Sequence, residues 1–381
     1  MCYVTAGAGH RRAAEALAQA IRARDPQADV RCLEVFAEAP WLGRAYAWTY
    51  LLLVRRLARV WALAYWLLDQ ELIYRAVQPL RRRWNLRVAC RFVRQLRALQ
   101  PDAVLATHFL PADVCGTGRA AGWLRGPLVV VVTDLFPHRF WITPHADAMV
   151  AGTAEGAEAL RARGVDPRCA HLIGIPVGSA FGATPDPAVL RQRLQLGASR
   201  RTVLVTSGGT TVGQFDEVVA ALSRLEERLP GRLQLLVVCG ENRRAAARLT
   251  ALAAAAAMPM RVFGFVDYMA DLMAVSDLIV CKAGGLTVSE SLERGLPLVL
   301  YHVIPGQEQL NAAYVERHGA AAIATRPDEV AEVVGRVMSD PARLDGMRRA
   351  AEGLRRPDAA GRIVEQVLLP LLAQREAKAK R

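Results

Sequence analysis

The stretch from Cys281 to Ala313 reads CKAGGLTVSESLERGLPLVLYHVIPGQEQLNAA and decides the fold of this chain. It follows an apolar strand predicted at 277–281 and continues into a turn at Gly284 and Gly285. Leu286 and Thr287, directly after this turn, open a predicted helix. Backbone N–H groups at the start of a helix have no partner within the helix and bind anions well. The stretch therefore predicts a site for a diphosphate.

Further polar residues follow this turn in an order that matches the parts of a nucleotide sugar. Glu290 lies in the predicted helix, where its carboxylate is suited to accept hydrogen bonds from ribose hydroxyls. After the next predicted strand, at 297–301, come Gln307, Glu308 and Asn311, whose side chains are suited to sugar hydroxyls. In chain order these residues predict contacts to a diphosphate, a ribose and a sugar.

Apolar strands and helical stretches alternate along the chain. In the second half we expect strands at 202–206, 234–239, 261–264, 277–281 and 297–301, and helices near 214–228, 242–256, 286–294 and 307–318. In the first half we expect strands near 2–5, 29–35, 102–107, 127–133, 147–151 and 170–174. Such alternation indicates βαβ units and parallel sheets. The sequence therefore predicts an α/β protein with two Rossmann-like domains.

The segment SAFGATPDPA at 179–188 is rich in turn-forming residues and predicts a linker between the domains. We expect an N-terminal domain at 1–182, a C-terminal domain at 190–358 and a final helix and tail at 359–381. Open parallel sheets bind ligands at the carboxyl ends of their strands. The ligand is therefore expected in the cleft that the linker spans.

Eight motifs occur in one order along the chain. They are GAGHRRAAEAL (7–17), LATHFLP (105–111), VVTDLFPHRFW (131–141), GIPV (174–177), VLVTSGGTTVG (203–213), VVCGEN (237–242), FGFVDYMADLMAVSDLIVCKAGG (263–285) and IPGQEQLNA (304–312). Together they resemble the monogalactosyldiacylglycerol synthase and processive diacylglycerol glucosyltransferase family, which is related to the N-acetylglucosaminyltransferase that completes the lipid-linked peptidoglycan precursor. The resemblance implies a GT-B fold and transfer of a hexose from a UDP-sugar to a diacylglycerol-type lipid.

The resemblance also implies roles for individual residues. Donor-binding roles fall on Gly208, Gly209, Thr210, Gly284, Gly285, Leu286 and Thr287 near the diphosphate, Phe265 and Val266 at the base, Glu290 at the ribose, and Gln307, Glu308 and Asn311 at the sugar. Acceptor-binding roles fall on Gly9, His108, His138 and Trp141. For His108, His138 and Trp141, ordinary structural roles remain an open alternative.

Two residues are candidates for catalysis. His10 follows the turn Gly7-Ala8-Gly9 at a junction between a strand and a helix, and a histidine near neutral pKa can remove a proton from an attacking hydroxyl. The alternative is that His10 only caps the helix, and the resemblance favours the base. Asp134 ends an apolar strand and is expected either to orient His10 or to serve as the base itself.

The chain contains no D-x-D triplet, which many metal-dependent sugar transferases use to hold a divalent ion on the diphosphate. Helix N-termini are therefore expected to neutralise the diphosphate charge. We expect neither a metal nor another cofactor.

Residues 45–68 form a long apolar segment, interrupted at its centre by Arg55, Arg56 and Arg59. A charge at the centre of a bilayer costs roughly 2.5–3.5 kcal/mol on insertion scales, so a membrane-spanning helix is disfavoured. The pattern predicts one helix that lies in the membrane interface. With its tryptophans and arginines, the region 41–97 is expected to bind an anionic membrane surface. A core helix whose arginines reach solvent remains the alternative.

The net charge and the cysteine content restrict the binding partners and the cellular compartment that we expect. The formal net charge is +13, and residues 1–100 hold 17 Arg against 7 Asp plus Glu, an excess of +10. Nucleic acid is a poorer partner than a membrane, because the aromatic residues lie in a long apolar helix instead of a groove. The seven cysteines form no C-x-x-C pair, which favours a reducing compartment, and no signal peptide opens the chain. We expect a peripheral protein on the cytoplasmic face of the cell membrane.

A single displacement at the anomeric carbon predicts an inverting transferase. Three alternatives stay open: N-acetylglucosaminyl transfer to a polyprenyl-linked acceptor, a UDP-sugar 2-epimerase, and a UDP-sugar-binding protein without catalysis. The epimerase has the same two-domain architecture but does not need a lipid-binding helix. The sequence does not select the sugar, the acceptor lipid or the number of sugars added.

Overall fold

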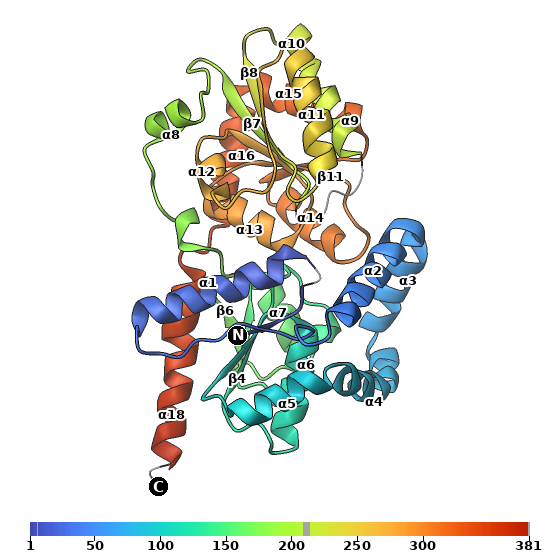
Figure 1. The fold of residues 1–381 in the computed structure, drawn as a ribbon, viewed down its shortest axis with the longest axis vertical. Helices are drawn as coiled ribbons and strands as arrows, with labels where there is room; N and C mark the ends of the chain where they lie inside the picture. The colour runs from blue at the N-terminus through green and yellow to red at the C-terminus, as the bar shows by residue number, and fades with distance from the viewer. Residues whose placement is uncertain (6, 209–213, 380–381) are drawn as a thin grey trace. The chain divides into compact units, whose positions relative to one another are not determined.

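The computed structural model describes residues 1–381 except 6, 209–213 and 380–381, and it also leaves out the side chains of 47, 50, 51, 55 and 379. The chain forms two units (Figure 1). The first unit contains Met1–Gly178, Pro305–Gln307 and Arg356–Arg381, and the second contains Ser179–Ile304 and Glu308–Arg355.

The first unit is built on a parallel sheet in the order β2-β1-β3-β4-β5-β6. The strands are β1 (Cys2–Tyr3), β2 (Leu33–Glu34), β3 (Val104–Ala106), β4 (Leu128–Val131), β5 (Ala148–Ala151) and β6 (Ala170–Leu172). The helices around it are α1 (Ala8–Arg24), α5 (Cys90–Leu99), α6 (Phe109–Ala120), α7 (Ala154–Ala162) and the 3₁₀ helix η1 (Arg139–Trp141).

Helices cover both faces of this sheet, as expected for parallel strands. Val130 of β4 packs on one face with Phe92 of α5. Its neighbours Val129 and Val131 pack on the other face with Leu17 of α1. Successive side chains of a strand point to opposite faces, so the apolar run of β4 fills both layers of the core.

The last helices belong to the first unit. They are α17 (Ala359–Ile363), a π-helical turn η3 (Val364–Leu368) and α18 (Leu369–Ala379). Ile363, Val367 and Leu368 are buried on the same sheet face as Leu17. Figure 1 shows this red segment beside α1. The chain end is therefore part of the core of the first unit.

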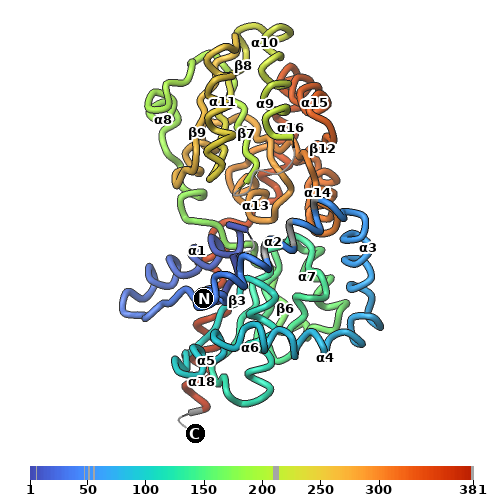
Figure 2. The backbone as a smooth tube through the Cα atoms, turned by 45° about the vertical axis from the view of Figure 1, so that its right-hand side comes forward, coloured from blue at the N-terminus to red at the C-terminus, as the bar shows by residue number. Residues whose placement is uncertain are grey.

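Between β2 and α5 the chain makes a helical excursion of α2 (Pro40–Arg56), α3 (Ala58–Asp69) and α4 (Glu71–Val88), drawn in blue in Figure 2. The prediction of one continuous helix over 45–68 is wrong. Leu57, at φ −128° and ψ 38°, ends α2 and begins α3. Neither glycine nor proline marks this break, so local sequence carried no signal for it. Among the described helices, none is both long and apolar enough to cross a bilayer.

The second unit has a parallel sheet in the order β12-β11-β10-β7-β8-β9. Its strands are β7 (Arg201–Thr206), β8 (Leu233–Val238), β9 (Met260–Phe263), β10 (Leu278–Cys281), β11 (Leu298–Tyr301) and β12 (Ala321–Ala324). Its helices are η2 (Ser179–Phe181), α8 (Pro187–Arg193), α9 (Phe215–Ser223), α10 (Leu225–Arg228), α11 (Arg243–Ala255), α12 (Met269–Ala274), α13 (Gly285–Glu293), α14 (Gln307–Arg317), α15 (Pro327–Ser339) and α16 (Pro341–Gly353).

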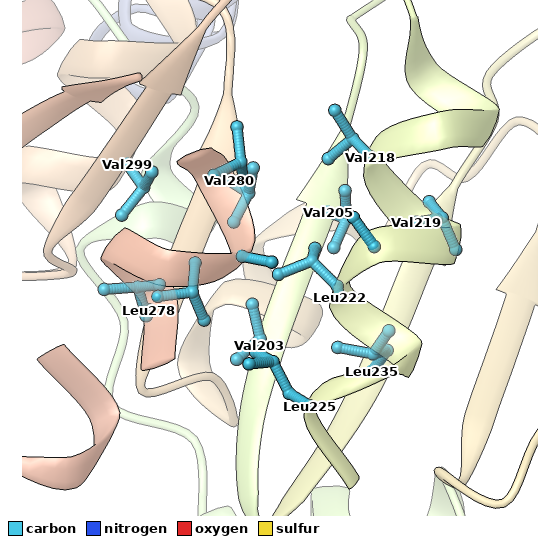
Figure 3. Packing of buried hydrophobic residues seen from close by; sticks show 14 of the residues in the cluster. Val203, Val205, Val218, Val219, Leu222, Leu225, Leu235, Leu278, Val280 and Val299 are labelled. Carbon is cyan, nitrogen blue, oxygen red and sulfur yellow. The ribbon is translucent and has the colours of Figure 1, made fainter. Parts of the chain in front are cut away.

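The core of this unit lies between the sheet and α9. Figure 3 shows Val203 and Val205 of β7 close to Leu222 of α9, with Leu278 and Val280 of β10 alongside. The predicted fold class, two Rossmann-like domains with parallel sheets, is confirmed.

Candidate active site

The strand order of the first unit has a switch point at the end of β1. The chain leaves β1 in one direction and β3 in the other, and such a switch point is where open parallel sheets bind ligands. His10 lies in the first turn of α1, after β1, and His108 follows β3. Their rings meet edge to face, with centroids 4.6 Å apart. The fold therefore brings two histidines from distant motifs together at this point.

Two threonines hold His10. Its Nδ1 lies 2.8 Å from the main-chain oxygen of Thr107 and 2.9 Å from the hydroxyl of Thr133. Because a carbonyl oxygen only accepts, Nδ1 carries the proton and donates it to Thr107. The Thr107 hydroxyl donates in return to the His10 carbonyl at 2.8 Å. Nε2 of His10 is therefore left with a lone pair, the form that a general base requires.

Burial keeps both histidines neutral. It lowers the pKa of His10 to about 4, against the opposing effect of the bond to Thr107. His108 is fully buried, and burial lowers its pKa well below the usual range. Its Nδ1 accepts the N–H of Leu110 at 3.0 Å and caps α6. His108 thus has a structural bond on one nitrogen and a proton on the other.

Asp134 follows β4 and is buried. The indole N–H of Trp141 donates to its carboxylate at 2.8 Å, and burial raises the pKa of Asp134 to about 7. The Trp141 ring centroid lies 6.3 Å from that of His10. Nδ1 of His10 is directed at Thr107 and Thr133, so it is these threonines, and not Asp134, that fix the orientation of the imidazole.

His138 has a different set of partners from His108. Its Nε2–H donates to the main-chain oxygen of Tyr65 on α3 at 2.9 Å, and its Nδ1 accepts the N–H of Phe140 at 3.1 Å. These bonds connect the loop after β4 to the helical excursion. Gly9 directly precedes His10 in α1.

The second unit has its own switch point, between β7 and β10. Gly208 follows β7 with φ +75°, a left-handed conformation that favours glycine, and a Cβ built on it would lie 3.9 Å from Lys282 after β10. The predicted donor residues Gly209 and Thr210 lie outside the described residues.

The turn after β10 leaves the start of α13 open. Gly284 is the N-cap of α13, and no side chain caps the helix there. A Cβ added to Gly284 would meet no atom within 4 Å. Gly285, Leu286 and Thr287 form the first turn, whose N–H groups have no partner within the helix. This arrangement suits an anion at the helix start.

Three acidic or amide residues lie around this turn. Glu290 is buried on α13. Asn311 of α14 donates to the main-chain oxygen of Ala283 at 3.0 Å and so supports the turn. Glu308 accepts the N–H of Ile304 at 3.1 Å, and burial raises the pKa of its carboxyl.

The remaining predicted donor residues occupy the ends of elements. Gln307 is the first residue of α14. Phe265 and Val266 follow β9, and Phe265 is exposed while Val266 is buried. Of the residues that hold the site, sequence reasoning missed Thr107 and Thr133. Thr107 directly follows β3 and Thr133 lies two residues after β4, both within recognised motifs, but threonine near a strand end is too common to be a signal.

Two Rossmann-like units with parallel sheets form the GT-B fold. The solved structure of Acinetobacter baumannii MurG is similar, with 19% identity, a TM-score of 0.56, and coverage of 75% of this chain and 78% of that one. *S. aureus* MnaA, solved with UDP, has 14% identity, a TM-score of 0.64, and coverage of 97% and 95%. At these identities the likeness concerns the fold alone.

Sequence comparison identifies the family. Residues 10–177 match the model of monogalactosyldiacylglycerol (MGDG) synthase, and residues 202–363 match the glycosyltransferase family 28 C-terminal domain. The processive diacylglycerol beta-glucosyltransferase of Bacillus cereus (strain 03BB102) is 29% identical over 274 residues, 72% of this chain and 69% of the relative. That of Bacillus licheniformis is 28% identical over 278 residues, 73% and 70%. Both halves of the chain thus match models of sugar-transferring enzymes, which confirms the predicted resemblance to the diacylglycerol glycosyltransferase family and the enzyme class, a hexosyltransferase.

Proposed function

We propose that this protein transfers a hexose, with inversion, from a UDP-sugar to the hydroxyl of a diacylglycerol-type lipid at a membrane surface. The observation that carries the proposal is the state of His10. Its Nδ1–H is held by Thr107, and burial keeps the ring neutral, so Nε2 is ready to accept a proton. The names of the curated relatives support diacylglycerol as the acceptor and glucose as the sugar.

The proposed reaction is one displacement. Nε2 of His10 takes the proton of the acceptor hydroxyl, and the oxygen forms a bond to the anomeric carbon as the bond from that carbon to the diphosphate breaks. UDP leaves with the bonding electrons. A single attack inverts the anomeric centre, so an α-linked donor gives a β-glycolipid.

In this proposal the second unit binds the donor. The free N–H groups at the start of α13 and the positive end of its dipole neutralise the charge that develops on the leaving diphosphate. Glu290 binds the ribose, backbone groups at Phe265 and Val266 bind the base, and Gln307 and Glu308 bind the sugar.

The helical excursion supports attachment to a membrane. Large apolar side chains that are each more than half exposed gather on α2, α3 and α4: Trp41, Trp48, Val60, Leu63, Trp66, Leu72, Leu80 and Trp84. Exposed arginines, such as Arg59 and Arg83, lie among them. Tryptophan suits the headgroup depth of a bilayer, and each basic residue near anionic lipid contributes about 1 kcal/mol. The proposed location is the cytoplasmic face, where the free cysteines stay reduced.

The test is a product assay with purified protein. Radiolabelled UDP-glucose, UDP-galactose and UDP-N-acetylglucosamine are each offered with diacylglycerol or a polyprenyl-linked acceptor in detergent. We expect label in a β-glycolipid from one hexose donor, and His10→Ala should lose transfer while still binding UDP in calorimetry. His171→Ala, which removes a half-buried histidine on β6, is the matched control.

The same assay separates the alternatives. Conversion of the UDP-sugar to its 2-epimer without acceptor would indicate an epimerase, and label in the polyprenyl-linked product would indicate the peptidoglycan-type reaction. UDP binding without any product would indicate a binding protein. Full turnover by His10→Ala would remove the proposed base.

A further inference from the structure

Helix α3 has two faces with different partners. Val60, Leu63 and Trp66 are exposed on one face and belong to the proposed membrane surface. Tyr65 and Asp69 lie on the other face and contact the loop after β4. One short helix therefore connects the surface of the protein to residues beside the site.

Asp69, the last residue of α3, makes most of this connection. Its Oδ1 accepts the backbone N–H of Arg139 at 2.8 Å, and its Oδ2 accepts from the guanidinium of Arg163 at 2.6 Å. Its main-chain oxygen accepts from Nε of Arg139 at 2.6 Å. The side chain of Arg163 is only 11% exposed, so the ion pair is shielded from water and stronger than a surface pair.

The loop that Asp69 holds begins and ends at the site. Asp134 at its start and Trp141 at its end are joined by the 2.8 Å hydrogen bond, and Trp141 approaches His10. Between them, Arg139 is bonded to Asp69 and His138 is bonded to Tyr65. A shift of α3 would therefore act on the middle of the loop, while Trp141 at its end lies beside His10.

We propose that Asp69 is a positioning residue that couples docking of α3 on a membrane to the loop from Asp134 to Trp141, so that transfer is faster when the acceptor is presented in a bilayer. This inference rests on the proposed function. Asp69 itself touches neither substrate, and it acts through Arg139 and Arg163.

The test compares transfer to the same acceptor in anionic phospholipid vesicles and in nonionic detergent micelles. For the wild type, kcat/KM for the acceptor should be higher on vesicles. In Asp69→Asn, which keeps the shape but loses the ion pair with Arg163, this ratio should fall about tenfold, equivalent to roughly 1.4 kcal/mol. KM for the UDP-sugar and the rate in micelles should stay within about twofold, because the donor unit is unchanged.

Glu71→Gln is the matched control. Glu71 opens α4 two residues after Asp69, is exposed and pairs with Arg75 at 2.5 Å. Glu71→Gln removes the same charge near the same surface and leaves the bonds of Asp69. Glu71 also lies 3.8 Å from Arg139, but a long, half-exposed ion pair of this kind contributes little. Arg163→Gln, which removes the partner side of the ion pair, should reproduce the effect of Asp69→Asn.

The outcomes are distinct. A vesicle-to-micelle ratio in Asp69→Asn equal to that of Glu71→Gln overturns the inference. An equal loss in vesicles and micelles also overturns it, because Asp69 then only maintains the fold. Asp69→Asn should still sediment with vesicles, since Leu63 and Trp66 are unchanged. A wild type that does not bind vesicles contradicts the membrane part of the proposed function instead.

Discussion

At the scale of single residues, the partly buried His10 and the buried Asp134 compete for the role of base, and pH separates them. Burial lowers the pKa of His10 to about 4 and raises that of Asp134 to about 7. The base form of His10 is therefore present at all pH values above about 4, whereas that of Asp134 appears only above about 7. Since kcat/KM reports the ionisation of the free enzyme, we expect it to be flat from neutral pH down to about 5 and to fall near 4.

The measurement is the pH profile of transfer at low acceptor concentration, with Asp134→Asn beside the wild type. A break near pH 7 in the wild type that disappears in the variant would assign the base to Asp134. A low-pH fall shared by both proteins agrees with His10.

The raised pKa of Asp134 also has a consequence for stability. A carboxyl that ionises at about 7 in the folded state but near its usual value of 3.8 when unfolded stabilises the fold at low pH. That contribution is lost as pH rises from about 4 through about 7. Asp134→Asn removes the dependence and keeps an oxygen for Trp141. We expect the variant to gain about 1–3 kcal/mol relative to the wild type at neutral pH, since each pKa unit is worth roughly 1.4 kcal/mol.

Urea unfolding at about pH 4 and pH 7.5 measures this gain. The difference between Asp134→Asn and the wild type should be larger at the higher pH. An equal difference at both values would show that Asp134 does not titrate in this range in the folded protein.

Gly284 tests the donor turn. Its φ of −67° is ordinary for any residue, and a Cβ there meets no protein atom, so Gly284→Ala should fold with a change within about 1 kcal/mol. In the proposal, the space that the methyl group enters is where the diphosphate approaches the backbone. We expect UDP affinity in calorimetry to fall at least about tenfold, roughly 1.4 kcal/mol. Gly346→Ala on α16, where an added Cβ also meets no atom within 4 Å, should leave the UDP affinity unchanged. Unaltered affinity in Gly284→Ala would place the diphosphate elsewhere.

The sequence identified the residues with a chemical role, but it did not identify the groups that hold them in place. His10, Asp134 and Gly284 were recognisable because each follows a strand within a motif. Thr107 was not, because the oxygen that holds His10 belongs to its main chain, and a backbone acceptor is independent of residue type. Contacts of this kind become visible only once the strand order is known.

At the scale of elements, apolar strands were easy to predict and two other features were not. The runs in β7, β8 and β10 are rich in valine and leucine, as buried parallel strands usually are. The strand β12 reads AAIA, and alanine has a low preference for strands, so it was missed. The break at Leu57 was missed because α2 and α3 have the same apolar and basic composition.

The exposed tryptophans of the excursion give a prediction for this element. Trp48, Trp66 and Trp84 are each more than half exposed, so replacing all three by serine removes little from the core. If these side chains enter the membrane interface, each replacement weakens the free energy of membrane binding by about 1 kcal/mol. This is less than the full burial of an apolar side chain contributes. We expect the triple variant to bind anionic vesicles about a hundredfold more weakly in sedimentation assays.

The control for this variant is Val189→Ser with Phe265→Ser, which removes exposed apolar side chains from the second unit. Vesicle binding of the control should match the wild type. Equal binding by the tryptophan variant and the wild type would exclude these side chains from the membrane contact.

At the scale of the whole molecule, the chain ends in the unit in which it began. The sequence predicted a final helix and tail at 359–381, but it did not predict which sheet this helix covers. Its apolar side chains complete one face of the first sheet, against Leu17, Val129 and Val131. The first unit therefore depends on residues that the chain supplies only after the second unit, and the stability of the two units can be separated by truncation.

A chain that ends at Arg355 should lose stability in the first unit only. Burial of Ile363, Val367 and Leu368 contributes about 1.5–3 kcal/mol each, which is a large part of the stability of a domain. Hydrogen exchange should become fast in β4 and stay slow in β7. A chain that ends at Leu372 is the control, because it keeps the buried residues and loses the exposed bond from Arg375 to Asp102. Equal protection of β4 in both truncated chains would mean that the first unit folds without its final helices.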